Sequence, residues 1–310
     1  MSQPSFTAQG GAALDVIGLG ELLWDCLPTG SKPGGAPANV AFHAQQLGLA
    51  AATATRVGND PLGEELLAFL QSQRLRTDLV QRDELHHTGT VDVVLLNGQP
   101  RYQFRPESAW DFLECTPEWQ AALGTARAIV FGSLAQRGAI SQATIQACLQ
   151  QVPATTWTVF DANLRPPHFT KDVIQQSLQH ARVLKLNTEE VGEIANFLDV
   201  PLDSEQEFAE QVLAIHPRVE WVCVTRGADG AALFGRGCQA EVPGVPVVVV
   251  DTVGAGDAFT AALLEGLLNN RNPQQILAFA NKLGAMVASR PGAMPDLSAE
   301  LPDLKQAIYG

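Results

Sequence analysis

Apolar and polar positions follow two alternating patterns from residue 14 to the C-terminal region. Short apolar runs, such as residues 14–20 and 127–132, are typical of strands, whereas segments with one apolar face, such as 36–48, are typical of helices. This alternation predicts an α/β fold with a central, mostly parallel sheet covered on both faces. The other strands expected are 51–58, 156–161, 182–187, 219–225 and 245–250, the last as a buried strand, and the other helices are 61–73, 140–151, 171–181, 188–198, 204–216 and 258–268.

Two hairpins interrupt this order. Residues 88–104 read as strand, Asn-Gly turn and strand, and we expect the segment 88–110 to form a lid inserted into the core. Residues 230–243 form the second predicted hairpin. We expect residues 14–308 to make a single domain and residues 1–13 to be a disordered tail.

The composition limits the kinds of partner. The chain has 310 residues, of which 46% are hydrophobic and 17% charged, and its net charge is −13. Such a charge makes nucleic acid a poor partner, and an anionic ligand would need a local binding device. The apolar runs are too short to span a bilayer. The five scattered cysteines form no metal-binding pattern, and the N-terminus does not resemble a signal peptide, so we expect a soluble cytoplasmic protein.

A carboxylate stands at the start of an apolar helix in DTVGAGDAFTAALLEG, residues 251–266. A helix N-terminus offers unpaired N–H groups and a partial positive charge, and glycines let the backbone approach a ligand. The amides of Gly254, Ala255 and Gly256 are therefore candidates to hold an anion. Asp257 would stay ionised in this turn and could accept a proton from an attacking hydroxyl. These parts suit phosphoryl transfer to an alcohol.

Other interpretations of the same stretch remain open at this point. An Asp at a helix start is often only a cap. The chain contains no G-K-[ST] phosphate loop. GLGE at residues 18–21 lacks the third glycine of a dinucleotide fingerprint, which disfavours a nicotinamide oxidoreductase.

A second glycine site lies in KPGGAPANVAF, residues 32–42. Gly34 and Gly35 precede a helix that carries Asn39, whose amide can both donate to and accept from hydroxyl groups. The arrangement suits close approach of a polyol, and it is equally compatible with an ordinary turn in which Pro37 starts the helix.

Together these stretches resemble the ribokinase-like (pfkB) family of sugar kinases. DTVGAGDAF resembles the C-terminal signature of the family, and GGAPANVAFHAQQLGLAAATATRVGNDPLG resembles its N-terminal signature. The resemblance runs from about Asp15 to Pro295. It implies a three-layer α/β/α core with a small β-hairpin lid, and the transfer of a phosphoryl group from ATP to a sugar hydroxyl.

The resemblance also implies roles for individual residues. Asp257 matches the general base, and the amides of residues 254–256 match the anion hole. The positions that match the sugar pocket are Asp25, Gly34, Gly35, Asn39 and Arg165. Arg165 could instead pair with Asp161 or Asp172.

The nucleotide side matches in the same way. NTEE places Asn187 and Glu190 beside the phosphates of ATP, where Glu190 would hold Mg²⁺ through water; Glu190 could also be a solvated acid at a helix start. Asp251 resembles a ligand of the monovalent cation, K⁺, that many members bind. Thr225, Gly227 and Asn281 match residues that contact the nucleotide.

The substrate is narrowed by likeness within the family. FDANLRP, GELLWDCLP and ESAWDF are most similar to fructokinases, so fructose is the first choice. Alternatives are 2-keto-3-deoxygluconate, because Arg165 could hold a carboxylate, and ribose, which Leu23 disfavours. A silent member of the fold, acting as a sugar sensor or assembly partner, is the rival of another class. The lid could form a homodimer contact or equally close a monomer.

Overall fold

The computed structural model describes residues 13–27, 30–96 and 99–310. Most of the tail predicted at residues 1–13 and the Asn97–Gly98 turn of the lid lie outside these ranges. A large sheet has the order β13-β12-β11-β10-β9-β8-β1-β4-β5, in which neighbours from β11 to β5 are parallel and β12 and β13 are antiparallel. In that order its strands are Cys238–Val242, Ala231–Gly235, Trp221–Thr225, Val183–Asn187, Trp157–Asp161, Ala128–Gly132, Val16–Leu19, Ala51–Gly58 and Val80–Asp83.

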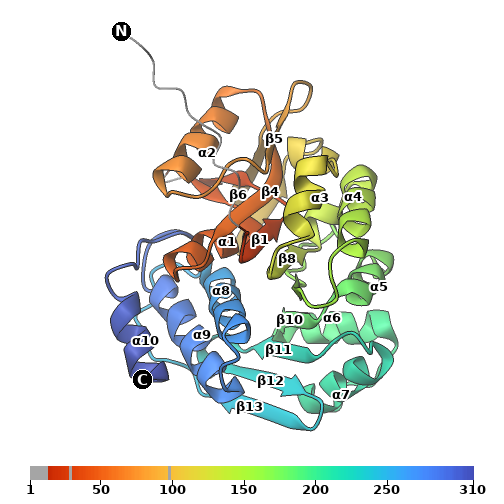
Figure 1. Ribbon diagram of the computed structural model, residues 1–310, viewed down its shortest axis with the longest axis vertical. Helices are drawn as coiled ribbons and strands as arrows, with labels where there is room; N and C mark the ends of the chain where they lie inside the picture. Colours follow the sequence, from red (N-terminus) through yellow and green to blue (C-terminus); the bar gives the residue numbers. More distant parts are fainter. Residues whose placement is uncertain (1–12, 28–29, 97–98) are drawn as a thin grey trace.

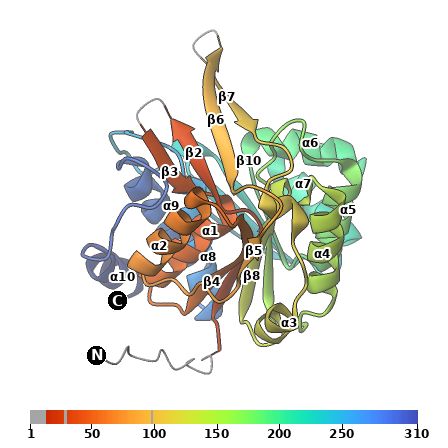
Figure 2. The same ribbon diagram turned by 90° about the horizontal axis from the view of Figure 1, so that it is seen from above.

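Helices cover both faces of this sheet, as the edge-on view of Figure 2 shows. On one face lie α1 (Ala36–Gln46), α2 (Pro61–Ser72), α8 (Ala255–Leu268), α9 (Pro273–Ala288) and α10 (Leu301–Tyr309). On the other lie α3 (Pro117–Leu123), α4 (Ala139–Gln150), α5 (Lys171–His180), α6 (Thr188–Leu198) and α7 (Glu205–Ile215). Short 3₁₀ turns are η1 (Ala109–Phe112), η2 (Leu134–Gln136) and η3 (Gly227–Asp229).

The strand side chains alternate between two cores, as the twofold period of a strand requires. In β10, for example, Val183 belongs to the core beneath α8 and α9, and Leu184 to the core beneath α4 to α7. The three-layer prediction with a mostly parallel sheet is therefore confirmed.

A second, small sheet has the order β3-β2-β6-β7 and projects from one edge of the molecule (Figure 2). Its strands are β3 (Gly30–Gly34), β2 (Leu23–Leu27), β6 (Gly89–Leu96) and β7 (Gln99–Phe104). The predicted lid hairpin is β6–β7. The sequence pattern did not predict β2 and β3, which join that hairpin through the parallel pairing of β2 with β6.

The expected buried strand at residues 245–250 is wrong. This segment has no regular secondary structure, and the side chains of Val248, Val249 and Val250 are 84%, 60% and 60% exposed. Pro243 and Pro246 interrupt donation from the backbone, and among the described residues only the Val250 amide of this segment finds a backbone acceptor, the Ala288 carbonyl oxygen at 2.9 Å.

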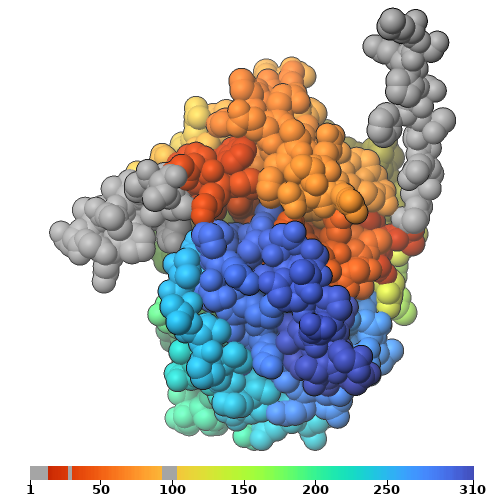
Figure 3. Space-filling view, turned by 90° about the vertical axis from the view of Figure 1, so that its left-hand side faces the viewer, coloured from red at the N-terminus to blue at the C-terminus, as the bar shows by residue number. Residues whose placement is uncertain are grey.

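Elements from the two ends of the chain lie side by side (Figures 1 and 3). The His43 ring Nε2 lies 2.9 Å from the Ala293 carbonyl oxygen, and the Gln46 amide nitrogen donates to the Pro295 carbonyl oxygen at 3.0 Å. Helix α1 also packs against α8. This packing brings the two glycine-rich stretches of the sequence together. Within the described ranges, no helix has the length and apolarity needed to cross a membrane.

Candidate active site

The N-terminus of α8 is built on a glycine that no other residue could replace without strain. Gly254 precedes the helix with φ 79°, and a Cβ added there would lie 2.5 Å from the Ala293 carbonyl oxygen. The amide of Ala255 donates to the Thr252 carbonyl oxygen at 3.2 Å. Among the described residues the amides of Gly254 and Gly256 have no such acceptor, so they are the better placed of the three predicted anion-hole donors.

Asp257 lies in the first turn of α8 and meets α1 directly. The Asn39 side-chain amide donates to Asp257 Oδ2 at 2.7 Å. Burial raises the pKa of Asp257 to about 6, and the charge of Asp161 adds to this rise; the bond from Asn39 and the charges of Lys185 and Arg165 oppose it. A carboxylate with such a pKa is ionised at neutral pH and still basic enough to take a proton.

The start of α1 is fixed by a second close approach. Gly35 has φ 113°, and a Cβ there would lie 2.4 Å from the Glu21 carbonyl oxygen. Helix α1 begins at Ala36 with Pro37 in its first turn, and Asn39 follows on the buried side. The diglycine turn therefore sets the position of Asn39 relative to Asp257.

Asp25 in β2 faces the same space. A Cβ on Gly34 would lie 2.1 Å from Asp25 Oδ2, so Gly34 makes room for this carboxylate. Burial raises the pKa of Asp25 to about 6, the charge of Asp257 raises it further, and that of Arg165 lowers it. The predicted sugar residues thus surround one region in which their charges act on each other.

Arg165 belongs to the turn after β9. Its guanidinium donates to the neighbouring Leu164 carbonyl oxygen at 3.2 Å. Among the described residues it forms no ion pair with Asp161 or Asp172. Its positive charge instead acts on the carboxylates of Asp25 and Asp257.

Asn187 and Glu190 form a reciprocal cap at the start of α6. The Asn187 side-chain oxygen accepts from the Glu190 amide at 2.9 Å, and Glu190 Oε2 accepts from the Asn187 amide at 2.9 Å. Glu190 Oε1 also accepts from the Leu164 amide at 2.7 Å, so this carboxylate holds the turn that carries Arg165. Burial raises the pKa of Glu190.

The other predicted nucleotide residues lie on β11, η3 and α9. Thr225 ends β11 and donates to the Leu186 carbonyl oxygen at 3.4 Å, and Gly227 follows in η3 with φ 55° and open space around it. Asn281 on α9 donates to the Pro243 carbonyl oxygen at 2.8 Å. Asp251, the predicted K⁺ residue, accepts from the amides of Val253 at 3.1 Å and Gly292 at 2.9 Å, which joins its own loop to the loop after α9.

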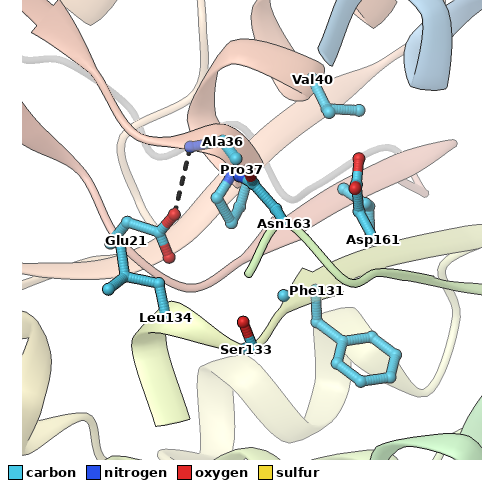
Figure 4. A pocket seen from close by; sticks show the side chains of 11 residues that line it. Glu21, Ala36, Pro37, Val40, Phe131, Ser133, Leu134, Asp161 and Asn163 are labelled. Carbon is cyan, nitrogen blue, oxygen red and sulfur yellow. Dashed lines mark hydrogen bonds between the residues drawn. The ribbon is translucent and has the colours of Figure 1, made fainter. Parts of the chain in front are cut away.

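Sequence reasoning assigned no role to Glu21, although it is 2% exposed beside the site. Its Oε1 accepts from the Ala36 amide at 3.2 Å (Figure 4), so it caps α1 in place of the missing side chain of Gly35. Its Oε2 has no partner among the described residues and lies at a cavity of about 10 Å³, which fits about one water molecule. Burial raises the pKa of Glu21 to about 7.

Asp161 and Lys185 were also missed as a pair. Lys185 lies within the apolar run VLKLN and Asp161 closes the run TVFD; a charge inside an otherwise apolar strand is the signal that could have found them. They form a buried ion pair with an Nζ to Oδ2 distance of 3.0 Å.

The fold and the two glycine-rich loops define a class of phosphotransferase. The family model "pfkB family carbohydrate kinase" matches residues 19–300. The chain therefore belongs to the pfkB family of carbohydrate kinases. The predicted family and the ribokinase-like fold are both confirmed.

Several of the relatives and solved structures to which the chain is similar are fructokinases. The chain is 33% identical to the fructokinase of Escherichia coli over 305 residues, which cover 90% of this chain and 94% of the relative. Among solved structures it is similar to the fructokinase of Xylella fastidiosa with bound ATP (TM-score 0.81, 26% identity, 95% and 99% of the two chains). It is also similar to the fructokinase of Vibrio cholerae O395 in a form with fructose, ADP and calcium bound (TM-score 0.78, 26% identity, 93% and 98%).

Proposed function

We propose that the protein is an ATP-dependent fructokinase in which Asp257 is the general base. The observation that carries this proposal is the 2.7 Å bond between Asn39 and Asp257, because it joins the sugar pocket to the N-terminus of α8. Fructose and ATP bound to the similar fructokinases support the two substrates.

The sugar would lie between Asp25, Asn39 and the turn of Gly34 and Gly35. Asp257 would accept the proton of one sugar hydroxyl while the oxygen of that hydroxyl attacks the γ-phosphorus of ATP, and ADP would leave as its bond to the γ-phosphorus breaks. The amides of the 254–256 turn would stabilise the negative charge on the transferred group. ATP would lie along the loops of Asn187, Thr225, Gly227 and Asn281, outside the carboxyl ends of the parallel strands, where open α/β sheets bind their ligands.

The residues present suit a magnesium ion that arrives with the nucleotide. Mg²⁺ keeps several waters and takes one or two carboxylates. Glu190 spends one bond of each carboxylate oxygen on a backbone amide, which leaves lone pairs that can accept from a metal-bound water. The ion would neutralise charge on the phosphates. Asp251, through the loops it joins, would shape the site for K⁺.

The small sheet would act as the lid of a single kinase domain, residues 14–308. Asp25 belongs to β2 of that sheet, so closure of the lid and placement of the sugar would be coupled. Closure would exclude water, which competes with the sugar as acceptor.

A sugar acid is the second candidate, and one observation favours it. The Arg165 guanidinium spends a single bond, at 3.2 Å, on the backbone of the described residues and faces the site. It therefore has donors left for a substrate carboxylate, as in 2-keto-3-deoxygluconate.

The test is an assay of ADP release with ATP, Mg²⁺ and K⁺ over fructose, ribose, 2-keto-3-deoxygluconate, fructose 6-phosphate and adenosine. Turnover on fructose alone would support the proposal. Turnover on the sugar acid would keep the mechanism and make Arg165 the residue that selects the substrate. Binding of ATP with no turnover on any of the five would contradict the proposal and favour the sensor interpretation.

A further inference from the structure

Two charged residues occupy the core face of neighbouring strands directly under the candidate site. Lys185 of β10 and Asp161 of β9 are paired in register across the parallel sheet. They point to the same face as Val183 and Val159, two residues earlier, which belong to the core beneath α8. Asp161 is 3% exposed and Lys185 is 7% exposed.

The pair is hydrogen-bonded and tied to α8. Lys185 Nζ lies 3.1 Å from Asp161 Oδ1 and 3.0 Å from Asp161 Oδ2. Thr260 Oγ1 donates to Asp161 Oδ2 at 3.0 Å, and Thr260 follows Asp257 by one helical turn. A buried ion pair is a poor stability device, because apolar residues of similar volume often serve as well. Stability therefore does not explain why this ion pair lies beside the candidate site.

That position is the inner side of the predicted anion hole. A Cβ added to Gly256 would lie 3.2 Å from Lys185 Nζ, so the ammonium group lies immediately beneath the Gly256 backbone. The amide of the same residue has no acceptor among the described residues. A fixed positive charge in a water-poor environment stabilises negative charge nearby more strongly than it would in water.

We infer that Lys185 is a positioning residue for the transfer step: held by Asp161, which Thr260 binds in turn, its ammonium group supplies positive charge behind the anion hole. Lys185 does not touch the substrates; it acts through the 254–257 turn. The inference rests on the proposed function. It explains how a chain of net charge −13 stabilises a transferred phosphoryl group at this turn, where Arg165 supplies the other positive charge that acts on Asp257 beside Lys185.

The two members of the pair act on Asp257 with opposite signs. The charge of Asp161 raises the pKa of Asp257 and that of Lys185 lowers it. Three other charged groups face Asp257: Glu21 at the β1–β2 junction, Asp25 in β2 and Arg165 in the turn after β9. Two further titratable groups face Lys185: Glu190 in α6 and Cys223 in β11.

The experiment compares Lys185→Met, Asp161→Asn and the double variant by the pH dependence of kcat. We expect Lys185→Met to move the acid limb to higher pH and to lower kcat by about 10-fold or more. Asp161→Asn should move the same limb to lower pH. The sugar KM should change little in either variant. In the double variant the limb should return toward that of the wild type while kcat stays low, because the charge behind the anion hole is still missing.

A merely structural pair would behave differently. Shifts in the same direction, no shift, or full recovery of kcat in the double variant would overturn the inference. Lys185→Met leaves a buried carboxylate unpaired and could fail to fold; the isosteric Asp161→Asn and the neutral double variant keep the test decisive.

A second measurement separates this inference from the proposed function. The Asp257 carboxyl carbon can be titrated by NMR with ¹³C-labelled aspartate, assigned with Asp257→Asn. Opposite shifts of its titration in Asp161→Asn and Lys185→Met would support the electrostatic part even if the wild-type protein phosphorylated no sugar. In that case only the proposed function would fail. Unchanged titration in an active kinase would overturn the inference alone.

Discussion

The side-chain amide of Asn39 donates a 2.7 Å hydrogen bond to Asp257 Oδ2, across 218 residues of sequence. The bond joins the first turns of α1 and α8, which carry the two glycine-rich loops of the chain. A single contact therefore fixes the orientation of the candidate base relative to Asn39 in the proposed sugar pocket.

Removal of this donor should weaken catalysis and make it more sensitive to acid. Because the bond from Asn39 lowers the pKa of Asp257, Asn39→Ala should move the acid limb of the kcat profile to higher pH. We expect kcat to fall about 10-fold at pH 7, since the base is also less well oriented. Gln45→Ala on the same helix is the control, because Gln45 bonds to the Gln73 and Arg74 carbonyl oxygens away from the site. Equal profiles for the two variants would contradict the role of Asn39.

Asp257→Asn should lower turnover and raise the stability of the fold at pH 8. Loss of a general base typically costs about 10²- to 10⁴-fold in turnover. The pKa of Asp257 is raised to about 6 in the folded protein, from 3.8, so its ionised form destabilises the fold as pH rises through 6. Asn carries no such charge, and the variant should be more stable by roughly 1–3 kcal/mol at pH 8 and equal to the wild type near pH 4. Urea unfolding at the two pH values, with turnover at pH 8, checks both halves; a folded Asp257→Asn protein with near-normal turnover would refute the base assignment.

Glu21→Gln should reveal the cost of the buried carboxylate that caps α1. Its pKa is raised to about 7, so the wild type loses stability as pH rises from about 5 to 8, whereas Gln keeps an oxygen for the Ala36 amide and remains neutral. We expect a gain of up to about 3 kcal/mol for the variant at alkaline pH and none at pH 4. The control is Glu65→Gln on the exposed side of α2. If Glu21→Gln were the less stable protein at pH 8, the ionised carboxylate would be a stabilising cap instead.

Gly254→Ala should lower kcat, and the same change at Gly237 serves as the matched control. Gly254 and Gly237 both have a left-handed backbone, with φ 79° and 73°, so alanine costs about 1–2 kcal/mol at either position. Only at Gly254 would the new methyl group meet another backbone, the Ala293 carbonyl oxygen at 2.5 Å, and displace the anion-hole amides. Thermal unfolding should therefore show a larger loss of stability for Gly254→Ala than for Gly237→Ala, and only Gly254→Ala should lose about 10²-fold in kcat. Comparable activity in the two variants would count against the anion hole.

Much of the fold could be predicted because the apolar pattern of β1, β8 or β10 reflects burial on both faces, and that of α8 reflects burial all round. The same pattern gave a wrong strand prediction for the exposed valines 247–250, because an apolar run does not show whether its backbone can pair with another strand. Strands β2 and β3 were missed because β3, GSKPG, has two glycines and a proline and no alternation.

The candidate site could be predicted where the residue types of a single loop already suit a ligand. Gly35, Asn39, Gly254 and Asp257 lie in loops whose residue types already suit a ligand, and the structure brings them together. The ion pair of Lys185 with Asp161 depends on the register of two strands separated along the chain, and the cap from Glu21 to Ala36 depends on a tertiary contact. The hydrophobic periodicity of the sequence indicates neither the ion pair nor this cap.

The meeting of Asn39 with Asp257 has a consequence for biosynthesis. A ribosome that adds about 5–20 residues per second leaves Asn39 without its partner for about 10–40 s, because 218 residues separate the two. During that time β1 can pair with β4, only about 30 residues away, yet its other neighbour β8 begins at Ala128 and α8 comes later still. The nascent chain therefore holds half of the candidate site beside apolar surfaces that stay exposed until α8 has been made, and surfaces of this kind are prone to aggregation.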